Sequence, residues 1–313
     1  MFSASEEGVI REEAEGCQKF RLSNKTGEME RTSYEVFDGI RLVYNDVHMK
    51  ESHTDLPSAP HTDRILEIDH CIEGRLERSK GDDFFYLSAG DMAIHKNADV
   101  EHNTFFPTGH YHGITVVIDL DNAPKCLSCF LKDVNVQPQN IVNRFCTDSD
   151  LFIARSNSRL EHIFAELYNV PEEVKTGYFK IKVLEILLFL SAFPIDSREE
   201  RKAYTLTQVQ LAKEVCRYLS EHMEQKIKVD ELAKRFHVSA TQLQSCFRGV
   251  YGESVYSYVR NQKIQSAAVM LKTTDKTVLE IANLHGYENA GKFASVFAEI
   301  MGVTPNEYRK ENL

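Results

Sequence analysis

The feature that most constrains this chain is an internal duplication in its last third. The stretch that begins at Val229 (VDELAKRFHVSATQLQSCFRGVYGESVYSY) is repeated from Val278 (VLEIANLHGYENAGKFASVFAEIMGVTPNEY), and one extra residue in the second turn brings the two into alignment. The matched positions are Leu232 with Ile281, Ala233 with Ala282, Ser239 with Asn289, Leu243 with Phe293, Phe247 with Phe297, Gly252 with Gly302 and Tyr258 with Tyr308. So many matches indicate two copies of one structural unit.

Each copy has the order of residues expected of a helix-turn-helix. A short helix with a small Ala is followed by a tight turn, and a polar residue then caps a second helix. In the first copy Leu243, Phe247 and Val250 recur at helical spacing, which predicts one buried stripe.

The opposite face of that second helix is polar. After the cap Ser239, this face carries Ala240, Thr241, Gln244, Ser245 and Arg248. Such a face suits DNA, since a glutamine can bond adenine through two atoms. It also suits the exposed side of a helical bundle, so the pattern alone leaves both interpretations open.

The second copy presents shorter side chains on its equivalent face. After the cap Asn289, they are Ala290, Gly291, Ala294 and Ser295, with Lys292 to one side. A glycine inside a helix costs about 1 kcal/mol relative to alanine, so Gly291 needs a reason: either close approach to DNA or close packing against a neighbouring helix. We expect the first copy to discriminate bases and the second to contribute phosphate contacts and shape readout.

Residues 258–275 lie between the copies and predict one continuous linking helix. Apolar residues recur there at helical spacing, namely Val259, Ile264, Ala267, Ala268 and Leu271. Recognition helices held about 34 Å apart would enter successive major grooves on one side of a duplex.

Residues 207–310 resemble the DNA-binding domain of the AraC/XylS family. The resemblance is carried by DELAKRF, YGES, YVR, EIANLHGY and MGVTPNEYRK. It implies two helix-turn-helix subdomains joined by a helix, in a transcription regulator that is usually an activator, with promoter DNA, RNA polymerase and a second copy as partners. Ser245, Ser295 and Ala298 stand where members often carry basic residues, so phosphate contact is weaker per domain and dimerisation more necessary.

The first half of the chain has a β-like pattern. Short runs rich in Val, Ile, Phe and Tyr occur between residues 34 and 120. Within them, EGRLERSKGDDFFYLSAGDMAIHKNADVEH resembles the cupin-like sensor half of the same family. We therefore predict an α+β multidomain chain. Its parts are a cupin-like β-barrel with an N-terminal arm at 1–146, a helical connector and dimerisation segment at 147–193, a linker at 194–206 and the DNA-binding domain at 207–313.

Eight of the twelve histidines lie in the β-like segment, which raises the question of a ligand or metal site. We assign effector binding to His70, His102, His110 and His112. His110 and His112 form an HxH that could chelate, and Cys126 with Cys129 forms a CxxC. The set departs from the cupin metal motif, however, and the CxxC favours ordinary packing. We expect no metal or cofactor and no enzymatic activity.

Two alternatives remain open: a cupin-type metal enzyme with an appended DNA module, and a regulator controlled by a protein partner instead of a ligand.

Charge is divided unevenly along the chain. The net charge is −10, yet residues 205–313 hold 14 basic against 12 acidic side chains. This balance permits DNA binding by the tail alone without demanding it. The longest strongly apolar run, residues 183–193, is too short for a bilayer, and seven cysteines without disulfide-framework spacing fit a reducing compartment. We therefore expect a cytoplasmic protein.

Overall fold

The chain divides into two compact units, residues 1–203 and 204–313. The computed structural model describes residues 8–14, 16–52, 64–96, 104–128, 136–146, 151–155, 158–195, 203–223, 225 and 227–311. None of the described helices is long and apolar enough to span a membrane.

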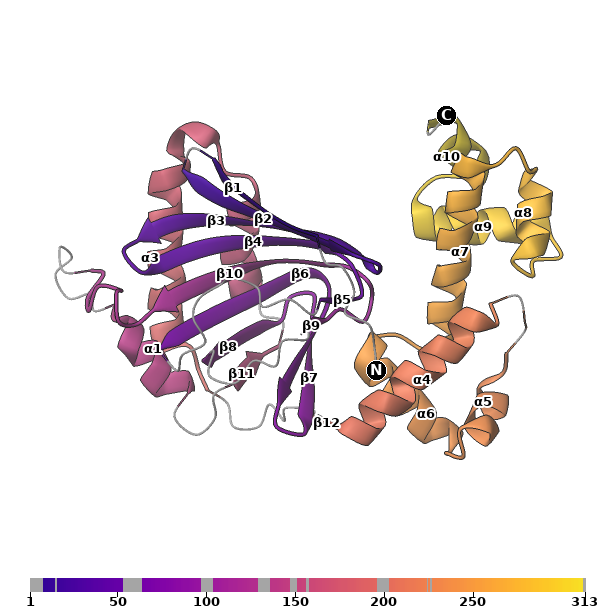
Figure 1. Cartoon of the computed structure of the whole chain (residues 1–313), viewed down its shortest axis with the longest axis horizontal. Coiled ribbons are helices and arrows are strands. Elements are labelled where there is room, and N and C mark those ends of the chain that lie inside the picture. The colour runs from indigo at the N-terminus through magenta and orange to yellow at the C-terminus, as the bar shows by residue number, and fades with distance from the viewer. Residues whose placement is uncertain are drawn as a thin grey trace. The chain divides into compact units, whose positions relative to one another are not determined.

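The first unit is built on a large antiparallel sheet (Figure 1). Its strands are β1 (Gly8–Ala14), β2 (Cys17–Asn24), β3 (Gly27–Phe37), β4 (Ile40–His48), β6 (Ile65–Lys80), β7 (Asp83–Ser88), β8 (Met92–Lys96), β10 (Tyr111–Asp119) and β11 (Leu151–Ala154). They pair in the order β1-β2-β3-β4-β10-β6-β7, with β8 on β6 and β11 on β8. A separate two-stranded sheet joins β5 (Glu51–Ser52) to β9 (Thr104–Phe105).

The large antiparallel sheet is compatible with the predicted barrel-like domain, but it is not closed within the described residues. The reason lies in β6, which is 16 residues long and changes partner along its length. Its first half pairs with β10 and β8, whereas its second half pairs with β7. The path of strands therefore branches at β6 and does not return to β1.

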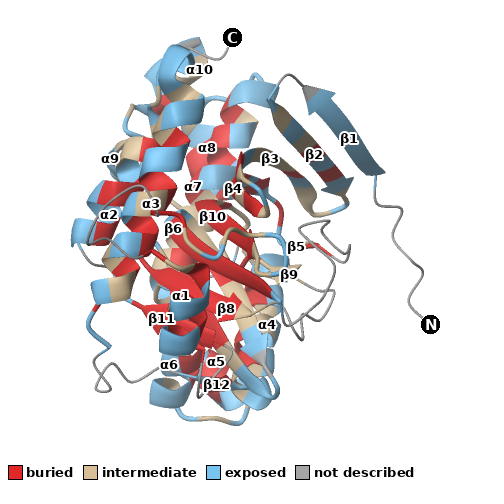
Figure 2. Cartoon of the chain, turned by 90° about the vertical axis from the view of Figure 1, so that its left-hand side faces the viewer, coloured by how far each residue is buried: buried red, intermediate tan, exposed pale blue. Residues whose placement is uncertain are grey.

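Helices cover one face of this sheet. They are α1 (Pro138–Phe145), α2 (Ser158–Ala165), the 3-10 turns η1 (Glu166–Tyr168) and η2 (Glu172–Val174), and α3 (Lys175–Ala192). Alternate strand residues such as Leu66, Ile68 and Val116 join buried side chains of the helices in one core. Figure 2 shows the inner faces of these helices buried and their outer faces exposed.

The other face of the sheet has a second core and carries polar side chains. Phe20, Met29 and Val47 pack there with Cys71 and Leu87. Strand alternation places the charged neighbours of Leu66 and Ile68 on this face as well.

The second unit is helical after a short extended segment, β12 (Tyr204–Thr205). Its helices are α4 (Leu206–Glu221), α5 (Val229–Arg235), α6 (Ala240–Tyr251), α7 (Val255–Thr273), α8 (Val278–Leu284), α9 (Ala290–Met301) and α10 (Pro305–Glu311). In Figure 1, α7 runs from the group formed by α4, α5 and α6 to the group formed by α8, α9 and α10. The predicted linking helix is therefore present and uninterrupted.

Candidate nucleic-acid interface

The first copy of the duplication folds as helix, turn and helix. α5 ends at Arg235, and the turn passes through His237, whose φ of 54° is in the left-handed region. The backbone N–H of Val238 donates to the carbonyl of Ala233 at 3.0 Å and closes the turn. The Ser239 hydroxyl then accepts the N–H of Gln242 at 3.1 Å, so the predicted cap begins α6.

Helix α6 buries one face and exposes the other. Leu243, Phe247 and Val250 are buried, as the spacing predicts. The candidate DNA-reading residues lie on the remaining surface. Ser239, Thr241, Ser245 and Arg248 are exposed, and Ala240 and Gln244 are half-buried. The arrangement presents a polar convex helix face to an approaching ligand.

A close contact that sequence reasoning missed holds the back of α6. A Cβ atom at Gly249 would lie 2.1 Å from Cε1 of the Tyr204 ring. Real Cβ atoms do not approach other atoms so closely, so the tyrosine can pack on α6 only where the helix has a glycine. Nothing in the local pattern around Gly249 could have found this contact, because its partner lies 45 positions earlier in the chain.

The second copy repeats the geometry with different residues. The turn after α8 uses Gly286 at φ 78° where the first copy has His237. The Asn289 side chain accepts the N–H of Gly291 at 2.8 Å and that of Lys292 at 3.0 Å. Helix α9 therefore also starts at its predicted cap, with two bonds in place of one.

Apart from Lys292, the exposed face of α9 carries short side chains. Gly291, Lys292 and Ser295 are exposed and Ala290 is half-buried. Among the described residues, the Asn289 Oδ1 atom, 3.1 Å away, is the nearest neighbour that a Cβ on Gly291 would meet. Packing of Gly291 against a neighbouring helix is therefore wrong as an explanation. The glycine leaves room for the capping side chain, and no side chain of its own covers the first turn of the helix.

Two further helix caps were not predicted, although the T-x-x-E pattern of a capping box is present in the sequence at both places. Thr277 and Glu280 cap α8 reciprocally, and Thr304 with Glu307 does the same before α10. Hydrogen bonds from the threonines hold the pKa of each glutamate below its ordinary value.

The candidate effector histidines of the first unit do not form one cluster. His70 lies under the helices, with its ring stacked on Phe164 at 4.2 Å between centroids, and burial lowers its pKa to about 4. His110 and His112 lie near the start of β10, with ring centroids 6.3 Å apart. His102 lies outside the described residues. The effector role of all four stays a prediction.

The predicted CxxC is described only in part. Cys126 is half-buried, and Cys129 lies outside the described residues.

A buried network of charged side chains lies on the sheet face that the helices do not cover, and it was not predicted from the sequence. Asp69 bonds Arg78 at 2.7 Å, His95 at 3.0 Å and Thr115 at 2.7 Å. Arg78 and His95 are the main groups that hold the pKa of Asp69 far below its ordinary value, against the opposing effect of burial. Glu67 lies 3.6 Å from His95. The signal was present as E-x-D in β6, but only the fold shows that both carboxylates face inward.

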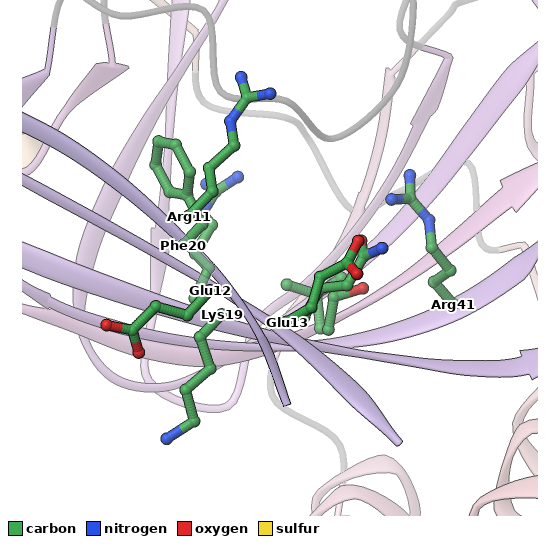
Figure 3. A pocket seen from close by; sticks show the side chains of 10 residues that line it. Arg11, Glu12, Glu13, Lys19, Phe20 and Arg41 are labelled. Carbon is green, nitrogen blue, oxygen red and sulfur yellow. The ribbon is translucent and has the colours of Figure 1, made fainter. Parts of the chain in front are cut away.

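A pocket of about 410 Å³ opens on the same face, over β1 to β4. It is lined in part by three arginines, Arg11, Arg31 and Arg41. Figure 3 shows Arg11 and Phe20 on one side of the strands and Glu12 on the other. The Nε atom of Arg31 is buried and has no hydrogen-bond partner among the described residues. The pocket therefore offers donors for an anionic group.

Comparison with known proteins places similarity in the second unit. A family model described as a helix-turn-helix domain matches residues 232–311. Regulatory protein SoxS of Salmonella typhimurium is 31% identical over 104 residues, which span 33% of this chain and 97% of SoxS. The Transposon Tn10 TetD protein of Escherichia coli is 32% identical over 101 residues, which span 32% of this chain and 73% of TetD. Among solved structures, the C-terminal domain of AraT, a response regulator from Geobacillus stearothermophilus, is 26% identical over 33% of this chain and 86% of its own, with a TM-score of 0.32.

Proposed function

Because this chain belongs to the AraC/XylS family of transcription regulators, we propose that it binds promoter DNA sequence-specifically and acts as an activator. The observation that carries the proposal is the matched pair α6 and α9. Both are 12-residue helices that begin at a side-chain cap and expose a polar face. Two such helices in one unit suit two successive major grooves.

The linking helix supports simultaneous binding. α7 has 19 residues, which at 1.5 Å per residue gives a rod of about 28 Å. That length is comparable to the roughly 34 Å of one duplex turn. Ile264 and Leu271 of α7 share one buried core with Phe293 and Phe297 of α9, so the second copy packs directly on the linking helix. The exposed pair Arg260 and Glu299 joins the same two helices.

The test is salt-dependent binding of the full chain to DNA from its own promoter. Lys292→Ala should weaken binding about equally on all sequences and lower the slope of log affinity against log salt by about 1, because one phosphate contact is lost. Lys25→Ala, with the same charge change in an exposed turn of the first unit, should change neither. Full-chain affinity that does not respond to salt would overturn the proposal.

We further propose that the first unit, as a cupin-like sensor, binds an acidic effector in the arginine-lined pocket. Arg31 carries this proposal, because its Nε atom is buried in the lining of the pocket and has no hydrogen-bond partner among the described residues. A buried donor without a partner costs about 1–3 kcal/mol, which a ligand carboxylate or phosphate would offset. Effector binding would then shift an equilibrium between two presentations of the DNA-binding units.

A thermal-shift screen of the full chain tests the effector proposal. Acidic metabolites should raise the melting temperature while neutral sugars should not, and Arg31→Gln should abolish the shift. Lys25→Gln serves as the control. If no metabolite stabilises the chain, control by a protein partner is the better explanation.

We propose that α3 forms the interface of a homodimer. Ile181 and Leu188 are exposed, seven residues apart on one side of this helix, the spacing of a coiled-coil seam. Gly177, on the preceding turn, has open space around it. Ile181→Glu should convert the dimer to a monomer in sedimentation, whereas Lys180→Glu, beside the seam, should not. An unchanged sedimentation coefficient for Ile181→Glu would contradict this assignment.

The remaining parts of the proposal follow from the family. We propose residues 1–146 as the sensor, 147–193 as the connector, 194–206 as the linker and 207–313 as the DNA-binding domain, working with RNA polymerase in the cytoplasm. The competing proposal, a metal-dependent enzyme with a DNA module, predicts turnover of a small substrate that is lost when the metal is removed.

A further inference from the structure

A cluster of potential metal ligands lies where β4 and β10 run side by side. Asp46 and His48 belong to β4, two residues apart and therefore on one face of the strand. His112 of β10 is the direct cross-strand partner of Asp46. Three side chains from two neighbouring strands thus share one patch of surface, and none of them belongs to the arginine-lined pocket.

The donor atoms of these side chains converge. Oδ1 of Asp46 lies 3.0 Å from Nε2 of His48 and 3.1 Å from Nδ1 of His112. The two imidazole rings are 5.0 Å apart between centroids, and all three ligand atoms lie within 4.8 Å of one another. In a tetrahedral site with bonds of about 2.0–2.1 Å, ligand atoms are about 3.3 Å apart. Small movements of the exposed Asp46 and His48 side chains would therefore open room for an ion.

The surroundings favour a cation. A pocket of about 430 Å³ adjoins Asp46 and His48 and is also lined by Glu28 and Glu30. Glu30 is held by Arg21 at 2.6 Å, so the pocket's arginine is already engaged with a carboxylate. Glu28 leaves negative charge beside the cluster.

The donor set selects the kind of ion. Two imidazole nitrogens and one carboxylate oxygen suit Zn²⁺, Cu²⁺ or Ni²⁺. Mg²⁺ and Ca²⁺ prefer ligand sets made of oxygen. His110 is not part of the core set, because its Nε2 faces Glu73 at 3.8 Å. A water molecule would complete four-coordination.

We propose that Asp46, His48 and His112 form a binding site for a divalent transition-metal ion, of which Zn²⁺ is the type. The ion would join β4 to β10 at the point where the register of β10 against β6 shifts, between His112 and Gly113. It would stabilise this end of the sheet and make the first unit sensitive to metal supply. The site goes beyond the effector and DNA proposals and departs from the expectation of no metal.

Titration of the metal-free full chain with zinc chloride and with cobalt chloride tests the site. We expect one ion per chain and a higher melting temperature with zinc. The Co²⁺ complex should lack a sulfur-to-metal charge-transfer band, which separates this site from the half-buried thiols of Cys17 and Cys126. His48→Ala and His112→Ala should each lower Zn²⁺ affinity at least tenfold.

His162→Ala is the matched control. His162 is also an exposed histidine beside a carboxylate, with Nε2 3.5 Å from Glu166, but among the described residues it belongs to no cluster of three potential ligands. Its loss should leave affinity unchanged. Asp46→Asn removes the carboxylate but keeps the size of the side chain. A loss of Zn²⁺ affinity in this variant would therefore not be caused by misfolding. Full zinc stoichiometry in the His48→Ala/His112→Ala double variant, a thiolate band with Co²⁺, or no binding of either ion overturns the proposal.

Discussion

The two helix-turn-helix copies share a backbone and differ in how each is held. Both recognition helices have 12 residues and end at a left-handed glycine, Gly252 or Gly302. The first copy has α6 packed under Tyr204 through Gly249. The second copy has the exposed Glu299 at the matching position, paired with a side chain of α7. At this matched position, the back of the second helix is therefore held by a buried ring contact in the first copy and by an exposed ion pair in the second.

Their outer faces differ as well. α6 presents the long side chains Gln244 and Arg248, whereas α9 presents Gly291 and Ser295. The Ser295 hydroxyl donates to the carbonyl of Gly291 at 3.1 Å. Its proton is therefore already used in a hydrogen bond within the helix. We therefore expect the first copy to reach into a groove and the second to lie close against the DNA backbone.

The largest expected difference concerns the two matched positions behind the helices. Gly249→Ala should cost about 2–3 kcal/mol of unfolding free energy, because a Cβ collides with a ring and overpacking strains the core. Glu299→Ala removes an exposed ion pair and should cost no more than about 0.5 kcal/mol. Urea unfolding of the full chain, followed by signals of the second unit, measures both.

If the Tyr204 ring causes the loss, the double variant Tyr204→Ala/Gly249→Ala should be less destabilised than the sum of its parts. Additive losses would show that the first copy is not held by this contact.

The next effect concerns base discrimination. Gln244→Ala should lower the preference for the correct base by about 1–2 kcal/mol at a single operator position, since a bidentate contact is lost. Ser295→Ala should leave base preference unchanged. Binding of both variants to a panel of single-base operator variants measures this, and relaxed preference from Ser295→Ala alone would reverse the roles of the copies.

A smaller effect is expected in the two turns. Gly286→Ala should cost roughly 1 kcal/mol, because an L side chain is disfavoured at positive φ. His237→Gly should gain roughly 0.5 kcal/mol, since relief of strain exceeds the added freedom of the unfolded chain. Thermal unfolding of the two variants gives the comparison. A loss from His237→Gly would mean that the histidine makes a stabilising contact of its own.

The smallest effect is the response to acid, which should have opposite signs in the two copies. The lowered pKa values of Glu280 and Glu307 in the second copy mean that their stabilisation is present above the ordinary value of 4.5 and lost as the pH falls through the lowered pKa. Burial raises the pKa of Glu253 in the first copy. Its contribution is therefore fully present below 4.5 and lost as the pH rises through the raised pKa.

Local stability measured by amide exchange at several acidic pH values, corrected for intrinsic rates, should show α8 and α10 weakening before α6. Simultaneous loss of protection in both copies would contradict the assignment of these carboxylates.

Much of the candidate DNA interface could be predicted because its determinants are local in sequence. Ser239 and Asn289 cap helices through N–H groups two or three residues away, and the stripe of Leu243 and Phe247 follows from the pitch of one helix. The position of His70 could not be predicted in this way. Its contact with Phe164 joins a strand to a helix more than ninety residues later, and no spacing rule reports such a pair.

The sequence by itself determined the duplication, the caps, the buried stripes and the linking helix, because hydrogen bonds and side-chain faces within a helix depend on residues three or four apart. Only the tertiary structure decided that the sheet is not closed among the residues it describes, that Gly249 makes room for Tyr204, and that Asp46 meets His112 across two strands. These contacts join residues 45 to 66 positions apart. Their geometry depends on strand register and packing, which the alternation of residue types alone does not specify.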